Sequence, residues 1–218
     1  MMEESNALPI LTSEEIRVLG ALIEKSKTTP EYYPLTLNSL VTACNQKSAR
    51  NPVVEYDDSV VMMTLDSLKK KQLTGTVIGA GSRAVKYRQN LGVAFPLDPA
   101  ELSLLCLLFL RGPLTAGEMN SNAGRLHEFD DLAEVQQTLE NLSNYVTPFV
   151  TQLPKRPGQK ESRFRHLFEP ILDFDESYFE DQSPARKNIS ELEQRMEKVE
   201  IELAELKDRF EKLMSELT

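Results

Sequence analysis

Residues 59–89 read SVVMMTLDSLKKKQLTGTVIGAGSRAVKYRQ, and this stretch decides the fold because it joins a predicted helix to a predicted β-hairpin. Its apolar residues recur on one helical face, at Val61, Leu65 and Leu68. Asp57 or Asp58 is the expected N-cap, and lysines end the helix where the dipole favours them. Two β-prone runs, LTGTVI and RAVKYRQ, then flank the glycine-rich GAGS, which predicts a hairpin.

Two further helices are predicted upstream of this stretch. Residues 13–25, SEEIRVLGALIEK, place apolar side chains at helical spacing behind Ser13, the expected N-cap. Residues 35–45, LTLNSLVTACN, form a short second helix with Thr36 as its cap. Pro52 in the following loop excludes a continuous helix there. Three helices and a hairpin in this order predict a winged helix.

The same order of elements is predicted a second time downstream. Helices are expected over PAELSLLCLLFLR (99–111), PLTAGEMNSNAGR (113–125) and FDDLAEVQQTLENLSN (129–144), followed by strands PFVTQL and SRFRHLFE around PKRPGQKE. Landmarks align between the copies: Glu15 with Glu101, residues 34–36 with 113–115, and Thr64-Leu65 with Thr138-Leu139. This pattern indicates a duplicated domain with longer loops in the first copy. The alternative is two unrelated small helical domains.

Two blocks also carry a resemblance to a known family. LTSEEIRVLGALIEKSKTTPEYYPLTLNSLVTACNQKSARNPVVEYDD and LSLLCLLFLRGPLTAGEMNSNAGRLHEF resemble the YceH-like family of bacterial proteins, and the resemblance runs from about Leu11 to Glu169. It implies tandem winged-helix domains and no assigned activity or catalytic residues.

A heptad pattern fills the C-terminal segment. Apolar residues alternate at spacings of three and four, at Ile189, Leu192, Met196, Val199, Leu203, Leu206, Phe210, Leu213 and Leu217. Such a seam predicts a coiled coil and a homodimer, with opposite charges facing each other in a parallel pair. Phe210 fits a dimer core poorly, and a helix that folds back onto its own chain is the alternative.

The predicted fold class is therefore mainly α with small antiparallel β-hairpins: two tandem winged-helix domains plus a C-terminal coiled-coil helix. The expected boundaries are a tail (1–11), domain one (12–95), domain two (96–170), an acidic linker (171–187) and the coiled coil (188–218). The net charge of −9 is uneven. Residues 1–95 hold 11 Lys/Arg against 10 Asp/Glu, whereas residues 96–182 hold 7 against 15. The first domain is therefore the better suited to a polyanion.

The sequence offers no set of residues for catalysis. No nucleotide-binding, zinc-protease or nucleophile-elbow motif is present, so no enzyme activity and no cofactor are expected. Cys44 and Cys106 lack metal-ligand spacing and are expected to be buried small hydrophobes. His127 is expected to open the second copy's third helix beside Glu128, Asp130 and Asp131, where helix capping is favoured over a metal site. His166 is expected to face solvent or to be hydrogen-bonded on a strand.

The N-terminus lacks the basic and apolar regions of a secretory signal. The longest apolar run, residues 102–110, is about half the roughly 20 residues needed to cross a bilayer. A cytoplasmic protein with no membrane partner is expected.

Winged helices commonly bind duplex DNA, with the third helix in the major groove and the wing on the backbone. The cationic candidates for phosphate contact are Lys47, Arg50, Arg83, Lys86, Arg88, Lys155, Arg156, Lys160, Arg163 and Arg165. The third helices look unsuited to base reading, because the first presents Asp57, Asp58, Ser59, Met62, Met63 and Asp66, and the second carries Glu128, Asp130, Asp131 and Glu134. Two hypotheses remain open: a dimeric DNA-binding regulator that grips phosphates through basic wings, and a protein-interaction scaffold that binds no nucleic acid.

Overall fold

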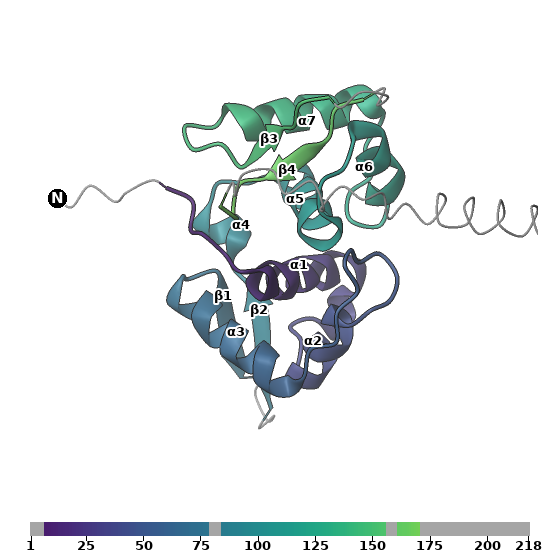
Figure 1. The fold of residues 1–218 in the computed structure, drawn as a ribbon. Helices are drawn as coiled ribbons and strands as arrows, with labels where there is room; N and C mark the ends of the chain where they lie inside the picture. Colours follow the sequence, from purple (N-terminus) through teal and green to yellow (C-terminus); the bar gives the residue numbers. More distant parts are fainter. Residues whose placement is uncertain (1–6, 79–83, 156–160, 171–218) are drawn as a thin grey trace, which may run out of the picture. The chain divides into compact units, whose positions relative to one another are not determined.

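A computed structural model describes residues 7–78, 84–155 and 161–170, all within one compact unit that ends at Pro170 (Figure 1). The described chain is mainly helical with two small antiparallel sheets of two strands each, as the sequence predicts. The predicted linker and coiled coil lie outside these residues, so the homodimer stays a prediction. Among the described residues, no helix is long and apolar enough to span a membrane.

The first half contains α1 (Ser13–Thr28), a 3-10 turn η1 (Pro30–Tyr32), α2 (Leu37–Cys44) and α3 (Asp58–Lys70), followed by β1 (Thr74–Ile78) and β2 (Val85–Gln89). The second half contains α5 (Pro99–Arg111), α6 (Ala116–Ala123), α7 (Leu132–Asn144), β3 (Val150–Gln152) and β4 (Phe164–His166). A short helix that the sequence analysis did not predict, α4 (Leu91–Ala94), joins the halves.

The N-caps explain where the helices begin. Thr36 and Asp57 cap α2 and α3, in agreement with the sequence analysis. The cap of α1, however, is Thr12 and not Ser13. Only Thr12 has a glutamate three residues later: Glu15 N donates to Thr12 Oγ1 at 3.3 Å, and Thr12 N donates to Glu15 Oε2 at 2.8 Å. Asp98 and Glu101 form the same capping box at α5.

The two hairpins have matching registers, which makes residues of the two halves equivalent. Thr76 lies opposite Tyr87 in one hairpin, and Gln152 lies opposite Phe164 in the other. Tyr87 also bridges to Leu35 as Phe164 bridges to Leu114. It follows that Lys86 corresponds to Arg163, and Arg88 to Arg165.

The third helices match as well. Their N-caps are Asp57 and Asp131. Thr64 and Thr138 follow these caps at the same spacing, and each hydroxyl donates to the carbonyl four residues earlier, at 2.7 and 2.8 Å. Met62 and Met63 of α3 therefore correspond to Gln136 and Gln137 of α7. The observed element order in both halves supports the duplication inferred from the sequence.

The two halves meet through their first helices. α1 packs against α5 in the middle of the described chain (Figure 1), and the Cys106 thiol lies 3.5 Å from the Gly20 carbonyl oxygen. A Cβ at Gly20 would lie 2.9 Å from Leu110 Cδ2 and 3.0 Å from Phe109 Cβ, so only glycine permits this approach. Buried side chains of both halves form one continuous hydrophobic cluster. Cys44 and Cys106 are both buried and unpaired, as predicted.

Candidate nucleic-acid interface

The first hairpin presents two cations on one face. Lys86 and Arg88 are two residues apart on β2, opposite Val77 and Gly75 of β1. Arg88 is exposed and Lys86 half-buried. Within the described chain, neither side chain has a carboxylate within the 4.0 Å limit of an ion pair. Their charge is therefore free to attract an anion. Arg83, the third predicted cation of this hairpin, falls in the undescribed turn.

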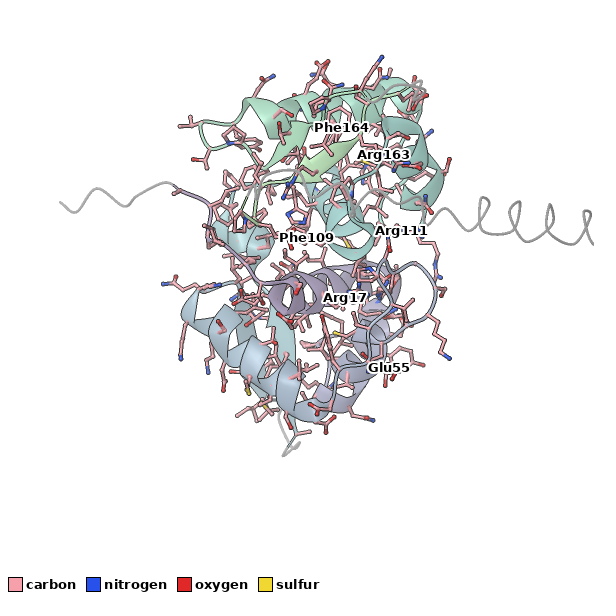
Figure 2. All side chains as sticks on the ribbon, in the orientation of Figure 1. Arg17, Glu55, Phe109, Arg111, Arg163 and Phe164 are labelled. Atoms are coloured by element: carbon pink, nitrogen blue, oxygen red, sulfur yellow. The ribbon has the colours of Figure 1, made fainter. Side chains whose placement is uncertain are left out.

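The equivalent cation of the second hairpin is neutralised. Arg163 lies next to Phe164 of β4 (Figure 2). It binds the Glu118 carboxylate through two hydrogen bonds of 2.8 and 2.9 Å, and it donates to the Pro113 carbonyl at 2.9 Å. Glu118 follows its helix cap Thr115 by three residues, and the corresponding residue after Thr36 is Ser39. The first half thus lacks the acid that occupies Arg163. This difference leaves Lys86, among the described residues, without the ion pair that its counterpart Arg163 makes.

The other cations of the second half contribute less. Lys155 is exposed beyond β3, whereas Arg165 is half-buried and donates to the His166 carbonyl at 3.4 Å. Arg156 and Lys160, two further cations predicted to contact phosphate, lie outside the residues that the structure describes.

Arg50 lies inside the protein, where a phosphate cannot reach it. Its guanidinium donates to both carboxylate oxygens of Glu24, at 2.6 and 3.1 Å, and to the Ala43 carbonyl at 2.9 Å. Its side chain is 0% exposed. Burial raises the pKa of Glu24, but the hydrogen bonds and charge of Arg50 outweigh burial and leave this pKa below its usual range. We therefore remove Arg50 from the interface, while Lys47, exposed in the loop after α2, stays a candidate.

The outward face of α3 has the composition that the sequence predicts. Asp57, Asp58, Ser59, Met62, Met63 and Asp66 are all exposed. Asp57 is also used structurally, because its carboxylate accepts a hydrogen bond from the Val60 amide at 2.8 Å. An acidic face with two methionines is repelled by phosphates and offers no amide or guanidinium to bases.

The outward face of α7 differs from the sequence-based expectation. Glu128 and Asp130 precede the helix and Asp131 is its cap, so these acids lie at its start. His127 also precedes the helix; its Nε2 lies 3.9 Å from Glu134. After the exposed Leu132 and Ala133 of the first turn, the exposed positions of the helix carry four amides and one acid: Gln136, Gln137, Asn141, Asn144 and Glu140. The helical period of the buried Val135, Leu139 and Leu142 is the signal that could have revealed them. Glutamine and asparagine are the side chains that pair with adenine edges.

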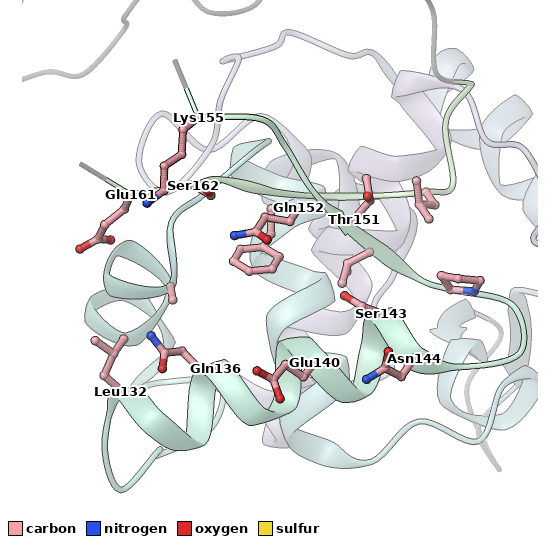
Figure 3. A pocket seen from close by; sticks show the side chains of 15 residues that line it. Leu132, Gln136, Glu140, Ser143, Asn144, Thr151, Gln152, Lys155, Glu161 and Ser162 are labelled. Atoms are coloured by element: carbon pink, nitrogen blue, oxygen red, sulfur yellow. The ribbon is translucent and has the colours of Figure 1, made fainter. Parts of the chain in front are cut away.

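A groove of about 680 Å³ runs between α7 and the second hairpin (Figure 3). Polar residues from both sides line it, including Gln136, Glu140, Asn144, Gln152 and Lys155. Among the described residues of this lining, Lys155 is the cation, and Glu140 and Glu161 are the acids. This described lining is therefore a mixture of polar and apolar side chains, and it joins the amides of α7 to the strands of the hairpin.

His166 is buried, which corrects the prediction that it faces solvent or is satisfied by hydrogen bonds. Its ring meets Phe109 edge to face at 4.9 Å, and its Nδ1 atom has no hydrogen-bond partner in the part of the chain that the structure describes. Its Nε2 atom lies 3.9 Å from a Glu169 carboxylate oxygen. Burial, together with the smaller effect of the Arg165 charge, lowers the pKa of His166 to about 3. The imidazole is therefore a neutral core residue, because its strand turns it toward α5.

We expect this histidine to make the protein less stable as the pH is lowered. The folded pKa of about 3 lies below the ordinary 6.5, so the unfolded chain gains a proton between these values and the folded chain does not. The free energy of unfolding should lose about 2 kcal/mol between pH 7.5 and pH 5 from this residue. Urea titrations of wild type and His166→Met at both pH values measure the effect, and an equal pH dependence in both proteins would contradict it.

The chain matches known proteins over most of its length. The family model described as "Protein of unknown function, DUF480" covers residues 11–159. A UPF0502 protein of Shewanella piezotolerans is 46% identical over 204 residues, covering 90% of this chain and 94% of the relative. The UPF0502 protein YceH of Escherichia fergusonii is 44% identical over 212 residues, covering 95% and 97%. A UPF0502 protein of Opitutus terrae is 50% identical over 161 residues, covering 73% and 70%. The resemblance seen in the sequence is confirmed: the chain belongs to the UPF0502 (YceH) family, which carries DUF480.

Proposed function

We propose that this chain is a non-enzymatic protein that binds duplex DNA through two tandem winged-helix domains. The order of three helices and a hairpin in each half supports this fold. The isolated bridges from Leu35 to Tyr87 and from Leu114 to Phe164 support it as well, because each adds to its hairpin the short third strand found in a winged helix. The predicted homodimer would double the number of contacts with a symmetric site.

The observation that carries the proposal is the unpaired charge of the first hairpin. Lys86 and Arg88 lie on one face of β2 without a carboxylate partner among the described residues, whereas Arg163 is held by Glu118 in the other hairpin. Cations with no internal partner can release counterions from DNA phosphates, and this release supplies most of the affinity in non-specific binding. The first hairpin is therefore assigned to the phosphate backbone.

The amides of α7 support a second contact. A third helix commonly enters the major groove in this fold, and Gln136, Gln137, Asn141 and Asn144 lie on its exposed side. These groups are neutral hydrogen-bond donors and acceptors, so they can pair with base edges but add nothing to the electrostatic attraction between the protein and the phosphates. The acidic α3 has no such role in this proposal.

A salt titration tests the assignment. We expect the full-length chain to shift the fluorescence anisotropy of a labelled duplex of about 30 base pairs at low salt. Lys86→Ala/Arg88→Ala should weaken binding at least roughly tenfold at 0.1 M salt. It should also flatten the slope of log K against log salt by about 1.8, the change expected from the loss of two phosphate contacts.

The matched control removes the same charge elsewhere. Lys27→Ala/Arg125→Ala changes a cation at the end of α1 and one in the loop after α6, outside both hairpins. An equal loss in this control would show that net charge, and not the hairpin, drives binding. Absence of binding by wild type at micromolar concentration would reject DNA binding. It would favour the alternative of an interaction scaffold without nucleic acid.

A further inference from the structure

Four exposed apolar side chains gather on the first half of the structure. Met62 and Met63 on α3 are 37% and 71% exposed, and Ile78 and Val85 on the hairpin are 71% and 41% exposed. We call these four residues the methionine face. Single exposed apolar residues are ordinary, but a group on two adjacent elements marks a binding surface.

The four residues form one surface. Ile78 and Val85 are cross-strand partners, so their side chains leave the hairpin on the same side. Tyr87 lies two residues from Val85 on that side, and its hydroxyl is 3.6 Å from the Met62 sulfur. The tyrosine therefore connects the hairpin part of the methionine face to its α3 part.

The fold itself does not require this surface. The positions of Met62 and Met63 are taken by Gln136 and Gln137 in the second half, which has the same element order. Met63 lies on the side of α3 away from its buried residues Val61, Leu65 and Leu68, and Met62 lies at the edge of that side. Their apolar character is thus left unexplained by packing.

Acids surround the methionine face. Asp58 and Asp66 are exposed on α3 one turn before and after the methionines, and the exposed Glu55 precedes the helix. Lys86 and Arg88 leave the hairpin on the opposite side, because they alternate with Val85 and Tyr87 along β2. Lys69 and Lys70 are also exposed at the end of α3, so the described rim, with the cap Asp57 included, has four acids against two lysines and a net negative charge.

We propose that the methionine face binds an amphipathic helix rich in Lys and Arg, supplied by another protein. Methionine side chains are unbranched and polarisable, so they adapt to the apolar side of such a helix. The aspartates at the rim then meet the cations on the edges of the helix and fix its orientation. The helix lies in the angle between α3 and the hairpin, by the helix-in-groove mode.

Charge argues against the other occupants. In a symmetric contact with a second copy, the rim aspartates would face one another across the interface, which is repulsive. The C-terminal segment 183–218 of this chain carries 7 Lys/Arg against 9 Asp/Glu, so it lacks the positive excess. DNA is repelled by the same acids. A basic partner helix is the occupant that the rim attracts.

This site is separate from the proposed DNA contact, since the two use opposite faces of the first hairpin. The test uses the full chain and a labelled synthetic helix of about 18 residues, with leucines on one face and lysines elsewhere. A helix with glutamates in place of the lysines is the control peptide. We expect anisotropy to show binding of the lysine helix below about 100 μM and none of the glutamate helix.

Variants locate the site. Met62→Gln/Met63→Gln installs the residues of the second half and should weaken peptide binding roughly tenfold or more without changing the melting temperature, because both side chains are exposed. Asp58→Asn/Asp66→Asn should weaken it as well, and more so at low salt. Val93→Gln/Val146→Gln, which changes two exposed apolar residues elsewhere, should have no effect.

Three results would overturn the proposal. The first is equal peptide binding by wild type and Met62→Gln/Met63→Gln. The second is no preference for the lysine helix over the glutamate helix. The third is a lower sedimentation mass for Met62→Gln/Met63→Gln than for wild type, which would show that the methionine face joins copies of this chain.

Discussion

Gly20→Val is expected to lower the free energy of unfolding by about 3 kcal/mol, because α1 and α5 leave no room for a side chain where they meet. The added Cβ would lie 3.0 Å from Phe109 Cβ, an atom fixed to its own backbone, and 2.9 Å from Leu110 Cδ2. The helices must separate, and the cluster shared by both halves loses contacts. Urea unfolding monitored by circular dichroism measures the loss.

Two alanine variants refine this prediction. Gly20→Ala should also destabilise, by about 1 kcal/mol, although alanine favours the helix at an unstrained site. At Gly117 of α6, the nearest atoms to a new Cβ lie at 3.6 and 3.9 Å, so Gly117→Ala should leave stability unchanged or raise it slightly. If Gly20→Ala stabilised the protein as much as Gly117→Ala, the close approach of α1 and α5 would be refuted.

Arg50→Met is expected to cost about 3 kcal/mol, because it removes both guanidinium hydrogen bonds to the mostly buried Glu24 carboxylate and leaves the Lys25 ammonium, 3.1 Å away, as the cation beside it among the described residues. The loss should shrink at low pH. The pKa of Glu24 is depressed in the folded state, so its contribution is present above the unfolded pKa and disappears as pH falls through the folded one. Denaturant titrations of wild type and variant at pH 7 and near pH 3 measure both effects.

The pair in the second half provides the comparison. Arg163 and Glu118 make the same two-pronged contact, but their side chains are 28% and 40% exposed. Arg163→Met should therefore cost only about 1 kcal/mol. Glu24→Met/Arg50→Met should recover part of the stability lost by Arg50→Met, since it removes the buried carboxylate together with its guanidinium, while Lys25 keeps its hydrogen bond to Gln46. Equal losses at Arg50 and Arg163 would mean that burial does not set the strength of these pairs.

Local signals in the sequence were sufficient for most of the fold. The segment 99–111 was predicted as a helix, and α5 has these bounds. Thr36 and Asp57 were identified as caps because capping depends on residues within one turn. Ser13 was wrong as a cap because serine and threonine are adjacent there, and only the position of Glu15 distinguishes them.

The surfaces were harder to predict, because charge availability depends on distant partners. Arg50 meets Glu24 across 26 residues, and Arg163 meets Glu118 across 45, and neither pairing has a local signature. The exposed amides of α7 were within reach of the sequence, because its buried residues define the opposite face. They were overlooked because the acids before the helix were counted as part of its surface.

The shared core of α1 and α5 also limits how the protein can be divided. Helix α5 is buried along nearly its whole length, from Glu101 to Leu110, and part of that cover comes from α1. The backbone amide of Leu11 further joins the start of the first half to the Phe168 carbonyl near the end of the second, at 2.7 Å. Each half thus covers part of the hydrophobic core of the other, and neither can be expressed alone without exposing leucines to water.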